Sequence, residues 1–470
     1  MNDQYCHVFE PDKRRQRIVC AFLFIVAVAA AAMLHRFDPR ISFLLPAALI
    51  LSLLLKNQSY MVFILVVFAF MRLDAWISSV FSLPFGKIMF LLSLSALASS
   101  FLFARSRPNR PTFPLLAWFI FILFSFAIGG IEASGEGVFL WISDTAYAAT
   151  FFLVIYFLVN SRERLEKIIY LIAFIGVVTT AINIAEFIDP AGLGLSHSSG
   201  RAAGLLKNAN TSAFIVNLSM VASIYSLRVV QRGWKVPLTV LLQVILFFGV
   251  FTTFSREGLL LYVLIFISQF FLIRQRSRKM LVAVLACTIL VFGLIRVVAY
   301  IRDGADSDVR YSYRKISTLV NGDIDDNDRY DLLTYHLSRF AAKPLTGHGL
   351  YSALSYSIPR QGLSINEVPN GPHNTFVMIL SETGIVPLVL YLVFLAALGW
   401  NIVFNGGVPG NNRDRAMRQC LLMLFISFLI HHGFSHMMLL SRYPMVLIAL
   451  FALPAEVFSS GDRLVEEKMS

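Results

Sequence analysis

Three short polar motifs interrupt long apolar stretches and hold the side chains most able to do chemistry. The first is RAAGLLKNAN (201–210), and the second is TFSREG (253–258). The third combines DRY (328–330) with PLTGHG (344–349) and GPHNTF (371–376), and a Glu-Thr-Gly sequence ending at Gly384 follows it. Arginine and histidine recur in these motifs, and these residue types bind phosphate groups and exchange protons near neutral pH.

The arginines are candidates for binding a diphosphate leaving group. Such a group gains negative charge in the transition state, and the planar guanidinium offers a fork of donors to phosphate oxygens. In a site shielded from water these donors lower the barrier by several kcal/mol. Arg256, at a junction between two apolar runs, and Arg329, on a predicted loop helix, are the principal candidates, and Arg201 is the third.

His373 is the candidate general base. An acceptor hydroxyl needs a base that titrates near neutrality, which favours histidine. His373 opens an apolar run directly after Pro372, so its position is restrained, and Asn374 follows it as a group able to orient the ring. The alternative is that His373 makes a hydrogen bond at a helix end and takes no part in the chemistry.

The elements that carry these motifs are predicted to be membrane-spanning helices. Of the 470 residues, 57% are hydrophobic and 14% are charged, whereas soluble chains average about 25% charged residues. Long apolar runs can cross a bilayer as helices, in which every backbone group is hydrogen-bonded. The pattern predicts an all-α polytopic membrane protein of about fourteen spans: 18–34, 41–55, 59–80, 85–103, 113–131, 138–159, 166–187, 209–230, 236–254, 257–273, 280–300, 373–404, 416–438 and 441–458.

Loop charge sets the predicted orientation. Basic residues cluster in alternate loops, which the positive-inside rule assigns to the cytoplasm: 105–110, 162–167, 228–235, 274–279 and 413–418. Both termini are therefore expected in the cytoplasm. The predicted organisation is about eleven spans in 1–300, a periplasmic loop 301–372, about three spans in 373–458 and a cytoplasmic tail 459–470. Within the loop, Asp328 is the predicted N-cap of a helix that ends before Pro344.

Ionisable side chains within the spans gather in the predicted outer halves or at the outer edges: Arg72, Asp74, Asp144, Glu186, Arg256, Arg296 and Glu382. The inner halves, by contrast, are predicted to be almost purely apolar. Charged groups in a bilayer are costly and usually face a cavity or a partner, so the pattern favours a cavity open to the periplasm. The alternative is that these side chains reach outward to the interface.

Composition and spacing argue against several other kinds of site. The net charge of +12 comes from residues scattered between spans, without the basic and aromatic patch that nucleic acid requires. None of the four cysteines lies in the long loop, so no disulfide framework is expected. His432 and His436 share a helical face next to His431 but lack a nearby third ligand, which disfavours a metal site. The acidic run 323–328 lacks the glycine and glutamate of a calcium loop.

Taken together, the three motifs resemble those of the bacterial O-antigen ligase and polymerase superfamily. The resemblance covers about 201–391 and rests on three features: the Pro-Leu-x-Gly-x-Gly turn, the His-Asn-x-Phe sequence that enters the next apolar run, and the glycine that follows (Gly384). One departure is Asn208-Ala-Asn210, where the superfamily pattern has Asn-Pro-Asn.

This resemblance implies a GT-C-like membrane glycosyltransferase that needs no metal and no other cofactor. It places His373, Arg256 and Arg329 in catalytic roles. The residues expected to contact substrate are Arg201, Asn208, Asn210, Ser255, Asn374, Gly347, Gly349 and Gly384.

The implied donor is an undecaprenyl-diphosphate-linked oligosaccharide at the periplasmic face of the bacterial inner membrane, where membrane lipids surround the chain. The implied acceptor is a hydroxyl on a growing polysaccharide or on lipid A–core. The predicted number of spans favours a polymerase of surface polysaccharide or exopolysaccharide repeats, because it exceeds the number associated with ligases. An O-antigen ligase is the alternative, and a protein O-oligosaccharyltransferase is a third. Whether a chain-length regulator takes part is left open.

A transporter or flippase for lipid-linked glycans is the rival from another class. Such proteins carry broken helices near the midplane and polar sites in both halves of the membrane. The predicted apolar inner halves therefore favour an enzyme.

Overall fold

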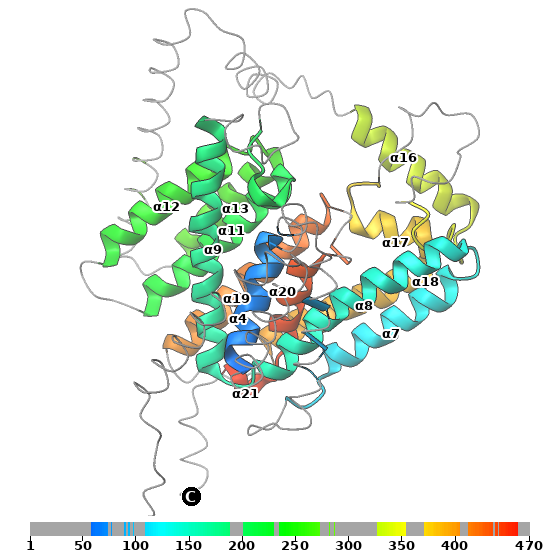
Figure 1. Ribbon diagram of the computed structural model, residues 1–470, viewed down its shortest axis with the longest axis horizontal. Helices are drawn as coiled ribbons and strands as arrows, with labels where there is room; N and C mark the ends of the chain where they lie inside the picture. Colours follow the sequence, from blue (N-terminus) through cyan, green and yellow to red (C-terminus); the bar gives the residue numbers. More distant parts are fainter. Residues whose placement is uncertain are drawn as a thin grey trace, which may run out of the picture. The chain divides into compact units, whose positions relative to one another are not determined.

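The computed structural model describes eight continuous stretches of the chain (Figure 1). They are 58–73, 109–188, 201–229, 235–272, 327–353, 371–404, 412–435 and 441–458, with a few isolated residues between them. The chain forms two compact units, residues 1–61 and 62–470. The second unit holds all three polar motifs.

Every regular element in the described stretches is a helix, and they contain no β-strand, which confirms the all-α class. The helices are α4 (Gln58–Met71), α7 (Phe113–Gly129), α8 (Gly135–Leu158), α9 (Arg162–Ile188), the 3₁₀ turn η1 (Gly204–Leu206), α11 (Ala209–Val229), α12 (Lys235–Phe251), α13 (Arg256–Leu272), α16 (Asn327–Ala342), α17 (Thr375–Thr383), α18 (Ile385–Val403), α19 (Asn412–His432), α20 (Arg442–Ala452) and α21 (Ala455–Phe458).

Most predicted spans that fall in the described stretches coincide with one helix each. The largest difference from the predicted ranges is six residues, at the end of α19, among helices α7, α8, α9, α11, α12, α13 and α19. Helix α4 covers only the first part of the predicted span 59–80. The predicted spans 18–34, 41–55 and 280–300 lie outside the described stretches, apart from isolated residues of the last. Span 85–103 is likewise described only at isolated positions, so the total of about fourteen spans stays a prediction.

Two predicted spans are wrong because the chain breaks within them. The range 373–404 divides at Gly384, whose φ of +82° is a conformation that residues with a Cβ rarely adopt. The resulting α17 has nine residues and is too short to cross a bilayer. The range 441–458 divides before Pro454, which cannot continue the hydrogen bonding of α20. In the loop, α16 begins at Asn327, so Asp328 lies in its first turn and is not its N-cap.

The described helices include surfaces suited to lipid. Helices α8, α9 and α18 are long and apolar enough to cross a membrane. Large apolar side chains remain exposed on neighbouring helices, including Leu123 on α7 at 63% and Trp400 on α18 at 60%. Apolar surface of this extent is unfavourable in water. These features support a membrane protein.

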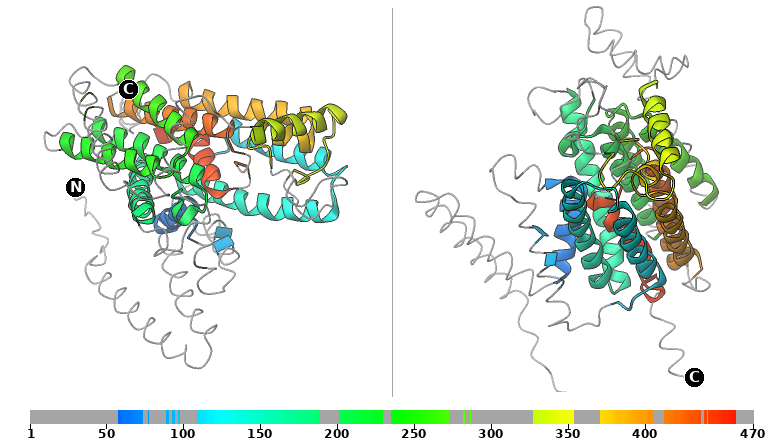
Figure 2. Two further views of the ribbon diagram at one scale, coloured as in Figure 1. Left: turned by 90° about the horizontal axis from the view of Figure 1, so that it is seen from above. Right: turned by 90° about the vertical axis from the view of Figure 1, so that its right-hand side faces the viewer.

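Helix α11 forms the centre of one part of the bundle. It packs against α9, α12, α13 and α19, and every residue from Ser212 to Tyr225 is buried. Its small polar residues allow close approach and bond to neighbouring backbones, as is common between membrane helices. Ser219 Oγ donates to the Ile172 carbonyl at 2.6 Å, and Asn217 Nδ2 donates to the Gly258 carbonyl at 2.8 Å. In the other part of the bundle, α7 packs along α18 and α8 along α20 (Figure 2).

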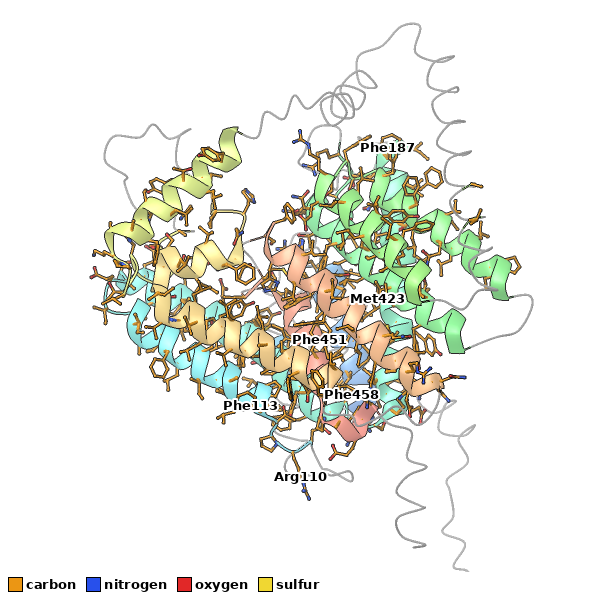
Figure 3. The ribbon with its side chains drawn as sticks, turned by 180° about the vertical axis from the view of Figure 1, so that it is seen from behind. Arg110, Phe113, Phe187, Met423, Phe451 and Phe458 are labelled. Carbon is orange, nitrogen blue, oxygen red and sulfur yellow. The ribbon has the colours of Figure 1, made fainter. Side chains whose placement is uncertain are left out.

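Helix ends that the charge pattern assigns to one side of the membrane meet at one end of the bundle. Tyr156 donates to the Arg110 carbonyl at 2.6 Å, and Thr112 donates to the Ala452 carbonyl at 3.0 Å. Figure 3 shows Arg110 and Phe458 at the end of the bundle opposite Phe187, as the alternation of loops requires. Which end faces the cytoplasm stays a prediction.

The inner halves of the helices are not almost purely apolar, so this prediction is wrong. Glu166, in the second turn of α9, is buried and accepts hydrogen bonds from Arg162 at 2.9 Å and Tyr225 at 2.8 Å, and it also pairs with Arg413. Buried Gln243 on α12 donates to Ser223 on α11 at 2.6 Å. Burying Glu166 is tolerable because both of its carboxylate oxygens have partners, and Gln243 is partly satisfied through its Nε2. One argument against a transporter is thereby lost.

Candidate functional site

The first two motifs come together through their side chains. Arg201 Nε donates to the Thr253 carbonyl at 3.1 Å, and its Nη2 donates to Asn210 Oδ1 at 2.9 Å. The same Asn210 oxygen accepts from Ser255 Oγ at 2.9 Å. Arg201 and Asn210 of the first motif and Ser255 of the second therefore form one cluster. Together with Arg256, which follows Ser255, they are called the arginine cluster.

Two helices begin at this cluster. Asn208 Oδ1 accepts from the backbone N–H groups of Asn210 (2.9 Å) and Thr211 (3.1 Å), which caps α11. Ser255 Oγ accepts from the Gly258 N–H at 3.0 Å and caps α13, whose first residue is the partly exposed Arg256. Helix N-termini carry partial positive charge. With Arg201 and Arg256 beside them, they make an environment that favours an anion.

A buried carboxylate holds the turn that presents Arg201. Glu186, at 2% exposure, accepts from the backbone N–H groups of Ala203 at 2.9 Å and Gly204 at 2.7 Å. Gly204 has φ +54°, and a Cβ there would lie 2.9 Å from Asn183 Oδ1. Glu186 thus joins the end of α9 to the first motif and orders the segment between Arg201 and α11.

His373 lies at the start of α17 in an unusual backbone conformation. Its φ is +50°, in the left-handed region that non-glycine residues seldom occupy. Asn374 anchors the start of α17, and its predicted role in orienting the His373 ring stays a prediction. Its Oδ1 caps α17 through Phe376 N (2.9 Å) and Val377 N (3.1 Å), and its Nδ2 donates to the Gly433 carbonyl at 3.3 Å.

The end of α19 connects His373 with the arginine cluster. Thr375 Oγ1 donates to the Ser435 carbonyl at 2.5 Å, next to the bond from Asn374 to Gly433. On the other side, buried His431 pairs with Glu257, the residue that follows Arg256. The motif at 253–258 is therefore fixed to the last turn of α19, and the motif at 371–376 to the residues directly after it.

The PLTGHG turn joins the C-terminal ends of α16 and α17. His348 N donates to the Ser381 carbonyl at 2.9 Å, Gly349 N to the Glu382 carbonyl at 3.0 Å, and Ile385 N to the Pro344 carbonyl at 2.9 Å. On its other side, Leu350 N donates to the Gly129 carbonyl at the end of α7 at 3.1 Å. The turn is thus held between two helix ends by backbone bonds.

The three predicted glycines have a packing role in this turn. Gly347, Gly349 and Gly384 all have positive φ. A Cβ on Gly349 would lie 2.6 Å from the backbone of Glu132, and one on Gly384 would lie 2.8 Å from the Pro344 carbonyl oxygen. They lie at the far end of α17 from His373, about 13 Å along the helix. Their assignment to substrate binding stays a prediction.

Arg329 lies in the first turn of α16, and its side chain is outside the described part of the structure. Helix α16 packs on α17, where buried His336 lies 3.1 Å from Ser381 Oγ. Arg339, one turn later, donates to Ser352 Oγ at 2.8 Å. These contacts of α16 do not test whether Arg329 reaches the arginine cluster.

His348 is the turn residue with a perturbed ionisation. Burial, together with the positive charges of Arg339 and Lys343, lowers the pKa of His348 below its usual value, while Glu132 opposes the shift. His348 is therefore neutral at physiological pH. Its buried Nδ1 has no hydrogen-bond partner among the described residues.

Sequence reasoning missed the Glu257–His431 pair and Arg442. Glu257 and His431 were not paired, because a contact between residues so far apart in the chain has no local signal, although Glu257 directly follows Arg256. The sequence pattern around His431 indicates only a candidate metal ligand beside His432 and His436. Arg442 was missed because it opens a span, yet its guanidinium lies 4.2 Å from the Tyr147 ring centroid in a cation–π contact.

Comparison with known protein families identifies the segment that carries two of the three motifs. Residues 241–392 match the O-antigen ligase family. This confirms the resemblance to the O-antigen ligase and polymerase superfamily that the motifs predict. No match to a curated protein was found.

The O-antigen ligase match runs from α12 into α18 and takes in Arg256, the PLTGHG turn and His373. It supports a membrane glycosyltransferase of the ligase or polymerase type. The match begins after the first motif and ends before α19. Contacts in the structure are what join Arg201, Asn210 and the end of α19 to the matched segment.

Proposed function

We propose that this chain transfers a glycan from an undecaprenyl-diphosphate donor to an acceptor sugar hydroxyl at the periplasmic face of the inner membrane. In this proposal the diphosphate binds at the cluster of Arg201, Asn210, Ser255 and Arg256, and His373 accepts the proton of the attacking hydroxyl. The anomeric carbon gains a bond to the acceptor oxygen and loses its bond to the diphosphate oxygen. The diphosphate leaves on its lipid.

The observation that carries the proposal is the convergence of two arginine motifs at two helix N-termini. Arg201 and Ser255 share Asn210 as an acceptor, so the first motif is fixed against the start of α13, where Arg256 lies. Arginine forks and helix N-termini both stabilise phosphate oxygens. A leaving diphosphate would gain from both as its charge develops.

The linkage through α19 supports a role for His373 in the same reaction. Asn374 and Thr375 bond to Gly433 and Ser435, directly after the helix whose His431 pairs with Glu257, so the start of α17 is anchored close to that pair. Arg329 is proposed as a second phosphate ligand, supplied from α16. This assignment rests on the sequence motif.

We favour polymerisation of repeat units over ligation to lipid A–core, on the number of predicted spans. The GT-C-like class is proposed on the same resemblance. Lipid and glycan analysis of a deletion strain separates these activities. Single lipid-linked repeats should accumulate if the chain is a polymerase. Accumulation of long lipid-linked chains would identify a ligase, and donor retained on the cytoplasmic face would identify a flippase.

A further inference from the structure

Two adjacent histidines end α19 and bond to different neighbours. His431 and His432 are both fully buried. His431 Nδ1 pairs with the Glu257 carboxylate, and its ring stacks on Phe214 with the centroids 4.0 Å apart and an interplanar angle of 10°. His432 Nε2 bonds to the Tyr391 hydroxyl, and its Nδ1 lies 2.8 Å from the Phe428 carbonyl oxygen.

These neighbours belong to the two halves of the proposed site. Glu257 follows Arg256 in the first turn of α13, and Phe214 is on α11, which begins beside Asn208 and Asn210. Tyr391 is on α18, and the Phe376 ring, in the first turn of α17, lies 5.9 Å from the His432 ring. His431 therefore contacts the part of the site that holds Arg256, and His432 contacts the part that holds His373.

Both rings are held at both nitrogens. His431 Nε2 lies 3.3 Å from the Tyr443 hydroxyl, in addition to its pairing with Glu257. His432 bonds at Nδ1 and Nε2 as described above. An imidazole fixed at both nitrogens has a single ring orientation, and two such rings on consecutive residues set the positions of their partners relative to each other.

We propose that the His431–His432 pair is a positioning element that sets the distance and orientation between Arg256 and His373. This inference rests on the proposed function. The two rings are fully buried, so they act through Glu257 and Tyr391 and do not touch substrate. Displacement of a reacting group by about 1 Å can lower a rate by about 10²-fold, which is why a buried brace between the leaving-group site and the base would matter.

Metal binding does not account for the pair. Within the described stretches no group of three metal-ligating side chains lies together, and both histidines already bond to protein groups. His436 lies outside the described residues. The inference therefore concerns hydrogen-bonded positioning alone.

The test is a double-mutant cycle on the purified full-length chain in lipid nanodiscs, with extracted lipid-linked donor. His431→Leu should lower kcat by at least about 10-fold while changing the donor KM by less than about 3-fold. In an Arg256→Lys background the same substitution should cost less than about 3-fold, because the group that it positions is already impaired. His432→Leu should show the same lack of additivity with His373→Ala.

Asn401→Leu is the matched control. Asn401 is 1% exposed and donates to the Phe451 and Leu453 carbonyls at 2.8 and 2.9 Å, away from the proposed site. This variant should lose stability but keep kcat. Equal losses from His431→Leu in the wild-type and Arg256→Lys backgrounds would overturn the inference. An unimpaired Arg256→Lys enzyme would instead count against the proposed site itself.

Discussion

At the scale of single residues, the backbone of His373 is the most informative feature. A φ of +50° costs a non-glycine residue roughly 1 kcal/mol or more and persists only where neighbours fix it. Here Asn374 and Thr375 fix it through bonds to Gly433 and Ser435. Such strain is concentrated at functional sites, which supports the prediction that His373 takes part in the reaction.

If His373 is the general base, its substitution should remove the chemical step and spare donor binding. His373→Ala and His373→Gln should both lower kcat by about 10²–10⁴-fold, because neither side chain accepts a proton usefully. Wild-type activity should fall as pH drops through the pKa of His373, since the protonated ring cannot act as a base. The measurement is the pH–rate profile of purified wild type and His373→Gln.

A purely structural His373 would give a different profile. Glutamine would then restore much of the activity through its hydrogen bonds, and the acidic limb of the wild-type profile would persist in the variant. That outcome would remove the base assignment and leave the glycosyltransferase proposal standing.

At the scale of elements, the PLTGHG turn explains why glycine occupies these positions. The turn passes so close to the loop after α7 that a side chain on Gly349 would meet the backbone of Glu132 and Ala133 at 2.6 Å. A shift of the turn to relieve this collision would disturb its backbone bonds to Gly129, Ser381 and Glu382. Glycine at these positions of the motif is therefore required for the turn to pack against the loop after α7, whether or not the turn also contacts substrate.

Gly349→Ala should destabilise the protein by at least about 2 kcal/mol, because its φ of +93° is unfavourable for alanine and because the new Cβ would collide with the backbone of Glu132 and Ala133. Gly135→Ala is the control, because a Cβ there meets nothing within 4 Å. Since Gly135 lies in the first turn of α8, its substitution should be neutral or slightly stabilising. Thermal unfolding in detergent measures both, and equal stability of the two variants would contradict the packing role.

The lowered pKa of His348 predicts a pH-dependent stability of the same turn. The folded state binds fewer protons at this site than the unfolded state once pH falls below the usual histidine value of 6.5. Stability should therefore be lost as pH drops below about 6.5. His348→Gln should lose less stability than wild type between pH 7.5 and 5.5. The comparison of thermal unfolding at the two pH values decides this, and parallel losses would exclude it.

At the scale of the whole molecule, the sequence predicted the helical class and most helix positions, because apolar length is a local property of the chain. It did not predict the break at Gly384 within 373–404, since a single glycine inside an apolar run does not reveal whether the chain continues straight. The pairing of Glu257 with His431 depends on how distant helices pack, which one sequence does not encode locally. The cluster of Arg201, Asn210 and Ser255 was predicted as a set of residues but without its bonds.

Orientation is the whole-molecule property that still rests on loop charge. A single cysteine at position 326, in a variant whose four native cysteines are replaced by serine, should react with an impermeant thiol reagent in intact spheroplasts. Labelling is expected because residues 301–372 are predicted to lie outside the cytoplasm. Labelling that requires lysis would reverse the topology and place the proposed site on the wrong side of the membrane.

The central claim is that the arginine cluster binds the diphosphate of a lipid-linked donor during glycan transfer. Its most direct test is single-turnover release of undecaprenyl diphosphate by the purified chain in nanodiscs, compared between wild type, Arg256→Ala and Arg256→Lys. Wild type should release the lipid diphosphate together with a lengthened glycan. Arg256→Ala should be slower by about 10²-fold or more, corresponding to a lost transition-state contact of about 3 kcal/mol, and lysine should rescue poorly because it replaces a fork with a point charge. Absence of lipid diphosphate release by wild type, or full activity of both variants, would contradict the account.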